Sequence, residues 1–362
     1  MAMRLFAPSS VRRLGPLTIL AIVLCGALVT PVHAQTTPTA SRYQYHLVSL
    51  KAALPPDVEY FDAVGITDDR RIYGTAYPCD ANGCFPSVAV YQRGKLTILH
   101  GGVTHAVNSF GLVGGSLYDP VTFAEQAAVF TGTRVRIIPR LPGETTSYVV
   151  GITNVGTTFV QSLNAAGESQ FYLYDAHSRI TPVNFGPGQI VDHPSINDDD
   201  IIAGTIVRPG SPDRAFRYDA TSRVMTILDP IRDNAKTWGQ GINRRGDVLG
   251  YSWSDGPERI GVWRRQTFQT YFVEGTPEFP TISGTLLWNR KGMIVITNSR
   301  NDLNSYLVPE PNVRIKVTDQ ASVLPAWTLV KGINARGDLI GSAGPSYGVA
   351  DFDFFLERVD AR

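Results

Sequence analysis

A twelve-residue phrase that recurs along the chain is the feature that most constrains its fold. It is clearest as GINRRGDVLGYS at residues 241–252, and it returns as GINARGDLIGS at residues 332–342. The asparagine of the phrase, or the threonine that replaces it, is here named the marker residue. Successive markers lie 41 to 46 residues apart, at Thr67, Asn108, Thr153, Asn197, Asn243, Asn289 and Asn334. A fixed period of this length indicates one supersecondary unit that is copied and stacked.

Each copy of the phrase predicts short strands rather than helices. Small and large apolar residues alternate before the marker, as in Gly241 and Ile242, and this period of two is that of a strand. The Asn-x-x-Gly segment is a tight turn, because both residue types tolerate positive φ. An aromatic strand and a last apolar strand follow, for example at residues 215–220 and 224–228.

Four strands in about 45 residues are typical of one propeller blade. The sequence therefore predicts an all-β fold, a β-propeller of about seven four-stranded blades. A glycine seven positions after the marker recurs in five copies, but Val160 and Ile296 replace it in the third and sixth. These two copies are the degenerate ones, and we expect their blades to be the least regular.

The phrase, followed by an Ala-Phe-x-x aromatic strand, resembles the HAF family of bacterial extracellular repeats. The strongest matches are residues 241–252, 332–342 and 215–218, and weaker ones cover residues 43–358. The departures are threonine at two markers, Arg70 and Asp200 in place of the turn glycine, and the lack of any His-Ala-Phe. The resemblance implies a secreted β-propeller whose biochemical role is unassigned, and it supplies no catalytic residue.

The last copy ends with an aromatic strand at residues 353–358 and lacks a fourth strand. Residues 43–50, YQYHLVSL, read as a strand that precedes the first marker. We expect this segment to pair with the last blade, because closure of the ring removes exposed sheet edges.

The first 34 residues have the pattern of a secretory signal peptide. Arg4, Arg12 and Arg13 precede an apolar stretch, and Val-His-Ala at residues 32–34 fits the cleavage motif. An uncleaved N-terminal anchor is the alternative. We therefore expect a signal peptide at 1–34, a flexible lead at 35–42 and a single propeller domain at 43–362. The protein is expected to be exported to the periplasm or the medium, with no later membrane span.

Charge is nearly balanced, with 33 lysines and arginines against 32 acidic residues. Loss of the three leader arginines leaves a slightly negative mature chain. A near-neutral surface argues against nucleic acid and against a strongly acidic polymer as the partner. A glycan or a protein is the expected partner, and we expect a monomer.

Two cysteines, Cys79 and Cys84, remain after the predicted cleavage. In an oxidising compartment this pair predicts a disulfide that pins one loop. A zinc site needs four ligands, and no second Cys or His pair has suitable spacing.

Acidic runs at residues 68–69 and 198–200 are the only candidates for cation ligands. Both fall in the predicted turns, where aspartate is favoured for its geometry alone. No metal or cofactor is therefore expected, and calcium is the alternative, although its Asp-x-Asp-x-Asp-Gly loop spacing is missing. No Gly-x-Ser-x-Gly nucleophile motif occurs either.

The longer, more varied connections are predicted on the face opposite the marker turns. Ligand sites prefer such concave and variable loop surfaces. Candidates for ligand binding there are Trp238, Trp253, His193, Asp192, Trp327 and Glu258, with His105 and Tyr148 nearby. The function predicted is a binding module, because no catalytic set is visible. The alternatives are an enzyme that uses Asp192 with Asp229 or Glu258 on an extracellular polymer, and a structural envelope component.

Overall fold

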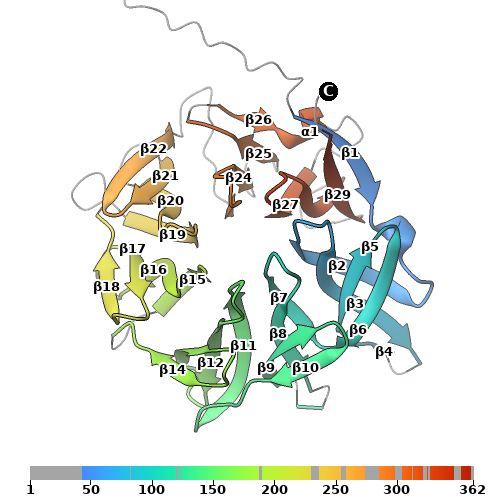
Figure 1. Cartoon of the computed structure of the whole chain (residues 1–362), viewed down its shortest axis with the longest axis horizontal. Coiled ribbons are helices and arrows are strands. Elements are labelled where there is room, and N and C mark those ends of the chain that lie inside the picture. The colour runs from blue at the N-terminus through green and yellow to red at the C-terminus, as the bar shows by residue number, and fades with distance from the viewer. Residues whose placement is uncertain are drawn as a thin grey trace, which may run out of the picture. The chain divides into compact units, whose positions relative to one another are not determined.

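A computed structural model describes most of residues 43–359 and shows a ring of seven antiparallel sheets (Figure 1). The residues outside the description are 1–42, 82, 120, 123, 187–189, 230–235, 254–257, 274–284, 298–303, 312, 321–323, 325–326, 346–351 and 360–362, together with the side chains of residues 190, 193, 272 and 273. The predicted signal peptide and lead lie outside the described residues. No helix in the described part is long and apolar enough to cross a membrane.

Each blade is one sheet whose first strand faces the centre of the ring and whose fourth lies at the rim (Figure 1). Blade 1 comprises β2 (Val58–Ile66), β3 (Ile72–Asp80), β5 (Ser87–Gln92) and β6 (Lys95–Gly101). Blade 2 comprises β7 (Val103–Val107), β8 (Val113–Tyr118), β9 (Glu125–Thr131) and β10 (Arg134–Ile137). Blade 3 comprises β11 (Glu144–Ile152), β12 (Thr158–Asn164), β13 (Ser169–Tyr174) and β14 (Ile180–Val183). Blades 4 and 5 comprise β15 (Ile190–Ile196), β16 (Ile201–Val207), β17 (Arg214–Asp219) and β18 (Val224–Ile227); β19 (Lys236–Ile242), β20 (Val248–Trp253), β21 (Arg259–Arg264) and β22 (Thr267–Val273). Blades 6 and 7 comprise β23 (Leu286–Trp288), β24 (Ile294–Thr297), β25 (Ser305–Val308) and β26 (Ile315–Lys316); β27 (Trp327–Ile333), β28 (Leu339–Gly344), β29 (Phe352–Val359) and β1 (Gln44–Ser49).

Three short elements lie between these strands: a 3₁₀ turn η2 (Lys51–Ala53), β4 (Gly83–Cys84) and α1 (Val317–Gln320). The sheet order confirms the predicted fold class of seven four-stranded blades. The third copy forms a blade with strands of ordinary length despite Val160. The sixth blade has short strands of two to four residues, as its degenerate sequence predicts.

Every marker residue begins the turn between the first and second strands of its blade. Its backbone N–H donates to the carbonyl four residues later, as from Asn243 to Asp247 at 3.1 Å. The residue three positions after the marker has a positive φ in all seven turns, at Arg70, Gly111, Gly156, Asp200, Gly246, Gly292 and Gly337. The side-chain oxygen of the marker, Oδ1 in asparagine and Oγ1 in threonine, also accepts hydrogen bonds from backbone N–H groups of the turn. Both Asn and Thr therefore fit this position.

The asparagine amide adds a second function that threonine lacks. Asn108 Nδ2 donates to the carbonyl of the next marker, Thr153, at 2.9 Å. The equivalent bond runs from Asn197 to Asn243 and from Asn289 to Asn334. Asn334 donates in the same way to Thr67 of blade 1 at 3.0 Å, across the join of the ring. The markers therefore link neighbouring blades as well as closing their own turns.

Glycines at two positions of the phrase make close approaches, although the space beside Gly241 is not crowded and Ala106, Ser195 and Leu287 replace glycine two residues before other markers. A Cβ on Gly151, two residues before a marker, would lie 2.7 Å from Ile196 of the next blade. A Cβ on Gly250, seven residues after a marker, would lie 1.9 Å from the carbonyl oxygen of Trp238 on the first strand. The small residue at position 151 thus leaves room for the neighbouring blade, and the glycine at position 250 leaves room for the adjacent strand of its own blade.

Ring closure occurs as predicted, through the N-terminal strand. β1 pairs antiparallel with β29, from Gln44 opposite Val359 to Ser49 opposite Phe354. Tyr43 and Tyr45 are buried in the core of blade 7, and the Tyr45 hydroxyl donates to the Gly337 carbonyl at 3.0 Å. The N-terminal strand therefore serves as the outer strand of a blade made from the other end of the chain.

Arg70 departs from the turn glycine because its side chain connects blades 1 and 7. Its Nε donates to Asp338 Oδ2 at 3.0 Å, and its guanidinium also pairs with Glu357. The Asp338 carboxylate is buried and further accepts from Asn334 Nδ2. An arginine at a strained φ is thus retained where it neutralises a buried carboxylate.

The two cysteines form a disulfide, with the Cα atoms of Cys79 and Cys84 3.9 Å apart. The surrounding loop is more ordered than the sequence indicated. Its residues extend β3 and pair it with β4 as a small hairpin beside blade 1.

Candidate functional site

The strongest candidate surface is carried by β19 and β20 of blade 5. Lys236 pairs with Trp253, and Trp238 pairs with Tyr251. Residues directly opposite in antiparallel strands project from the same face, as do residues two apart. These four side chains therefore share one face, at the end of the strands that the variable loops occupy.

Both tryptophans of this face reach solvent. Trp238 is 37% exposed and Trp253 is 50% exposed, whereas Tyr251 beneath them is buried. The rings of Trp238 and Tyr251 lie 5.2 Å apart between centroids. Two exposed indoles on adjacent strands offer flat apolar faces without contributing to the core.

Polar groups hold the two indoles in place. Asp213, just before β17 of blade 4, accepts from Trp238 Nε1 at 3.0 Å and lies 3.4 Å from Lys236 Nζ. Lys236 Nζ in turn lies 6.0 Å from the ring centroid of Trp253. We name Asp213, Lys236, Trp238 and Trp253 the tryptophan cluster. It joins aromatic faces to one cation and one carboxylate.

Lys236 and Asp213 were not among the sequence candidates. Residues 229–238 read as a variable loop, but β19 begins at Lys236. Once the strand is extended to that residue, its alternation places Lys236 beside the tryptophans. Asp213 belongs to the neighbouring blade, so only the packing of blades brings it to the cluster.

The other predicted candidates are dispersed or covered. Trp327 is 6% exposed at the start of β27, so its ring packs in the fold and offers no surface to a ligand. The side chain of His193 lies outside the described residues. Asp192 is exposed on β15 and Glu258 is half-buried before β21, in different blades. The backbone carbonyl oxygen of Asp229 accepts a hydrogen bond from Trp263 Nε1, with 3.0 Å between the two atoms.

A polar cluster around His105 lies between blades 2 and 3. His105 Nε2 is 3.0 Å from Ser116 Oγ and 3.2 Å from Glu125 Oε2, and the Tyr148 ring lies beside it. The hydrogen bond from His105 lowers the pKa of the Glu125 carboxyl. Ser116 is fully buried and donates to Glu125, so its oxygen is not presented as a nucleophile. The cluster is a satisfied inter-blade network.

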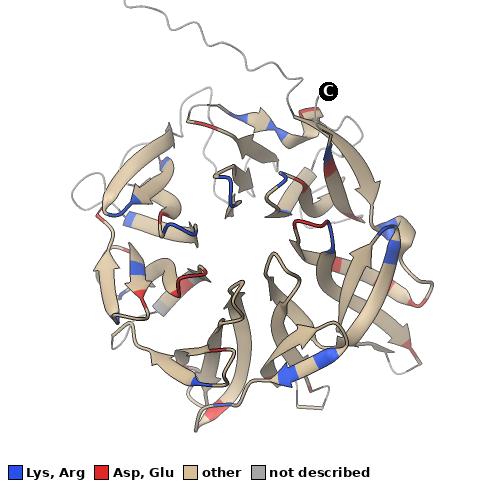
Figure 2. Cartoon of the chain, in the orientation of Figure 1, with Lys and Arg blue, Asp and Glu red and all other residues tan. Residues whose placement is uncertain are grey.

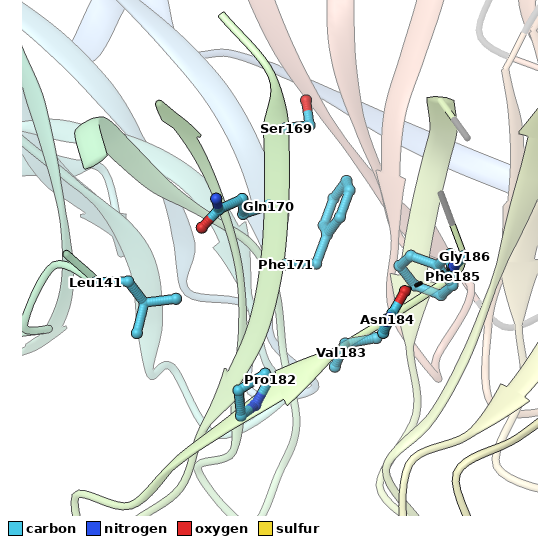
Figure 3. A pocket seen from close by; sticks show the side chains of 9 residues that line it. All are labelled: Leu141, Ser169, Gln170, Phe171, Pro182, Val183, Asn184, Phe185 and Gly186. Carbon is cyan, nitrogen blue, oxygen red and sulfur yellow. Dashed lines mark hydrogen bonds between the residues drawn. The ribbon is translucent and has the colours of Figure 1, made fainter. Parts of the chain in front are cut away.

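A small hollow opens at the edge of blades 3 and 4, as Figure 3 shows. Its volume is about 260 Å³, just below the range of typical small-molecule sites. Nine residues line it: Leu141, Ser169, Gln170, Phe171, Pro182, Val183, Asn184, Phe185 and Gly186. The rings of Phe171 and Phe185 are buried and pack edge to face, so the hollow is mainly a defect in core packing.

Three aspartates of the marker turns have partners within the protein, whereas the buried Oδ1 of Asp200 has no hydrogen-bond partner among the described residues. Asp68 accepts from the Ala335 N–H of blade 7, and Asp198 accepts from the side chain and N–H of Asn154 in blade 3. Asp69 pairs with Arg71 at 2.9 Å. These contacts give the acidic turns a structural role between blades. Among the described residues, three potential ligand groups converge only at Glu59, Cys79 and Cys84, where the disulfide occupies both sulfurs.

No family model matches the chain, and no curated protein matches its sequence. Among solved structures, the propeller domain of the Trilobed protease from Pyrococcus furiosus is similar, with a TM-score of 0.58, 7% identity, and coverage of 83% of this chain and 96% of that one. An oligogalacturonate lyase in complex with manganese has a TM-score of 0.58, 11% identity and coverage of 88% and 97%.

A prolyl endopeptidase structure has a TM-score of 0.54 and 12% identity. The similar region covers 83% of this chain and 51% of that one, so it spans about half the length of the endopeptidase. At these identities the likenesses establish the propeller fold alone.

Proposed function

We propose that this protein is an exported β-propeller that binds a glycan through the tryptophan cluster. The observation that carries the proposal is the pair of solvent-exposed indoles, Trp238 and Trp253, on adjacent strands of one blade. Exposed aromatic faces stack on the apolar face of a sugar ring. Lys236 and Asp213 lie beside them and supply a donor and an acceptor for sugar hydroxyls.

The surroundings of the cluster support binding rather than chemistry. Its carboxylate, Asp213, already accepts from Trp238 and pairs with Lys236. The similar solved structures share only the propeller fold with this chain, so the fold itself selects neither binding nor catalysis. Export rests on the predicted signal peptide together with the disulfide between Cys79 and Cys84. Membership of the HAF family stays a prediction.

The test is calorimetric titration of the purified full chain with a panel of neutral oligosaccharides. Trp253→Ala is expected to raise the Kd of the best ligand at least about tenfold, a change of about 1.4 kcal/mol. Phe110→Ala is the matched control, because Phe110 is 65% exposed on the opposite side, in the marker turn of blade 2. Circular dichroism should show both variants folded.

Three results would overturn the proposal. One is the lack of saccharide binding by the wild-type chain. Another is binding that Trp238→Ala and Trp253→Ala leave unchanged. Release of products from the saccharide would instead support the enzyme alternative.

A further inference from the structure

The face of the ring that carries the marker turns is divided by charge. The turns of blades 5, 6 and 7 bring Arg244 and Arg245, Arg290 and Lys291, and Arg336 to the centre of the ring. The turn of blade 4 carries aspartates instead, at residues 198–200, and the turn of blade 1 carries both signs, with aspartates at 68–69 followed by Arg70 and Arg71. Figure 2 shows the basic residues on the β19–β20, β23–β24 and β27–β28 turns, which lie between the acidic β15–β16 turn on one side and the β2–β3 turn, with residues of both signs, on the other. The overall charge is balanced, but the turns of blades 5 to 7 carry more basic than acidic residues, and Arg290 lies 3.7 Å from Asp198 of the blade 4 turn.

The basic turn of blade 5 borders an open groove between blades 4 and 5. The groove has a volume of about 870 Å³ and is lined by Arg217, Thr226, Arg245, Gly246, Asp247, Arg265, Gln266 and Thr267. Arg217 and Thr226 are paired on β17 and β18, whereas the other residues come from the two turns of blade 5. Three guanidinium groups thus converge on one space from two blades.

The single carboxylate in the groove does not neutralise these arginines. Asp247 accepts from Asn243 Nδ2 at 3.0 Å as part of its own turn. Its other neighbour, Arg245 Nε, is 3.9 Å away, on a side chain that is 81% exposed. Among the described residues, no carboxylate lies within 4.0 Å of the Arg217 or Arg265 guanidinium. With three guanidinium groups and one carboxylate, the lining of the groove keeps a net positive charge.

Arg265 occupies a position where the backbone favours glycine. It begins the two-residue turn between β21 and β22 with φ +59°, a left-handed conformation that strains a residue with a Cβ. The equivalent position in blade 2 is Gly132, with φ +58°. The turn therefore does not require the arginine, and the guanidinium at the groove is the feature that Arg265 adds.

The chemistry of the lining selects one class of anion. Arginine binds carboxylate and sulfate groups bidentately. Thr226, Thr267 and Gln266 add the hydroxyl and amide groups that sugar hydroxyls pair with. A single-stranded nucleic acid would call for aromatic side chains to stack its bases, and no aromatic residue lines the groove. A membrane surface would call for exposed apolar side chains, which the lining also lacks.

We propose that this basic groove binds an acidic glycan whose carboxylate or sulfate groups pair with Arg217, Arg245 and Arg265. The groove lies on the turn side of the propeller, and the tryptophan cluster lies on the loop side. The proposal therefore concerns a second site and stands without the first.

The experiment uses the full chain with three probes of matched length: a uronate oligosaccharide, a sulfated dextran oligosaccharide and a neutral dextran oligosaccharide. Affinities are measured by calorimetry at low and at moderate salt. We expect an acidic probe to bind, the neutral probe to bind the Trp253→Ala variant at least about tenfold more weakly, and affinity to fall with salt. Preference for the uronate or for the sulfated probe identifies which anionic group is recognised.

Arg265→Gly is the decisive variant, because glycine accepts this turn conformation and only the guanidinium is lost. Arg93→Gly is the matched control, since Arg93 begins the equivalent turn of blade 1 with φ +50° and is also exposed. Arg265→Gly should weaken acidic-glycan binding about fivefold to tenfold, the loss expected for one charge-assisted contact. Arg93→Gly should leave it unchanged, and both variants should keep the wild-type thermal midpoint.

Several outcomes would overturn the proposal: no binding of either acidic probe at low salt, equal affinity of the Trp253→Ala variant for the neutral and the acidic probes, or equal effects of Arg265→Gly and Arg93→Gly. Trp253→Ala should leave acidic-glycan binding intact. Loss of that binding in Trp253→Ala would place the anion on the loop side and also count against the groove.

Discussion

Blade 4 and blade 7 reach the same four-stranded sheet by different routes. In blade 4 a short turn joins β17 to β18, and Asp219 Oδ1 accepts the N–H groups of Thr221 and Ser222 at 2.9 and 3.0 Å. In blade 7 no turn joins β29 to its outer neighbour, which is β1 from the other end of the chain. Blade 4 is completed by a local turn, whereas blade 7 is completed by pairing between residues about 300 positions apart in the sequence.

The contacts differ in kind accordingly. Blade 4 relies on one acceptor side chain within a solvent-exposed turn. Blade 7 relies on buried aromatic groups, with Tyr43 and Tyr45 in its core and the Arg358 guanidinium 4.9 Å from the Tyr43 ring centroid. Because a distant strand must pay the entropy of closing a very long loop, it needs more buried surface than a hairpin strand does.

The largest effect is expected from removing the outer strand of blade 7. Deletion of residues 43–50 should abolish the single cooperative thermal transition, because it exposes β29 as an edge and uncovers the core of that blade. Calorimetry and analytical ultracentrifugation measure the transition and any aggregation. A peptide of residues 43–50 added in trans should restore part of the transition. A truncated protein that melts like the wild type would refute closure by this strand.

A smaller effect is expected from Tyr45, which is 9% exposed. Tyr45→Ala should lower the free energy of unfolding by about 3–5 kcal/mol, as for other large buried aromatic residues. Tyr45→Phe should cost about 1–2 kcal/mol, because the Gly337 carbonyl loses its donor. Met225→Ala on β18 is the blade 4 control, and its half-buried side chain should cost about 2 kcal/mol or less. Urea unfolding gives these values, and equal losses for Tyr45→Ala and Met225→Ala would remove the distinction between the two blades.

The smallest effect concerns the turn of blade 4. The backbone N–H of Ser222 and then that of Thr221 lower the pKa of Asp219 in the folded protein below its ordinary value of 3.8. This contribution is fully present above pH 3.8 and is lost as the pH falls through the lowered pKa.

Asp219→Asn keeps the acceptor oxygen and removes the charge. At pH 7 it should cost at most about 0.5 kcal/mol, because the turn is exposed to solvent. The difference from wild type should shrink as the pH falls from 3.8 through the lowered pKa of Asp219, since protonation then removes the same charge. Unfolding curves that stay offset by a constant amount across that whole pH range would contradict this role of the carboxylate.

Much of the fold could be predicted from residues that act locally. The marker asparagines, the turn residues with positive φ and the glycines next to carbonyls each impose their geometry on a few neighbours, so a repeat of sequence becomes a repeat of structure. The two departures at the third and sixth copies had unequal outcomes. Val160 is accommodated in a full blade, whereas Ile296 lies in the shortest one, and the difference depends on strands that flank them.

The candidate site was predicted in part. Trp238 and Trp253 carry the proposed surface, but Trp327 has the same residue type and is buried, because its position at the start of β27 packs it inside. Asp213 and the groove arginines were not predicted from the sequence, because the cluster and the groove each combine residues of blades 4 and 5. Residue type and local pattern do not reveal which blades' turns will face one another.

The sequence by itself determined the number of blades, the place of each marker turn and the strand that closes the ring. These follow from backbone requirements that operate within one repeat, and from a missing fourth strand at one end. Only the tertiary structure decided that the basic turns of blades 5 to 7 gather on one side of the ring, and that Trp238 and Trp253 remain exposed. Such surfaces depend on how seven similar units are rotated about one axis, which brings together side chains of different blades and marker turns that lie about 45 residues apart in the sequence.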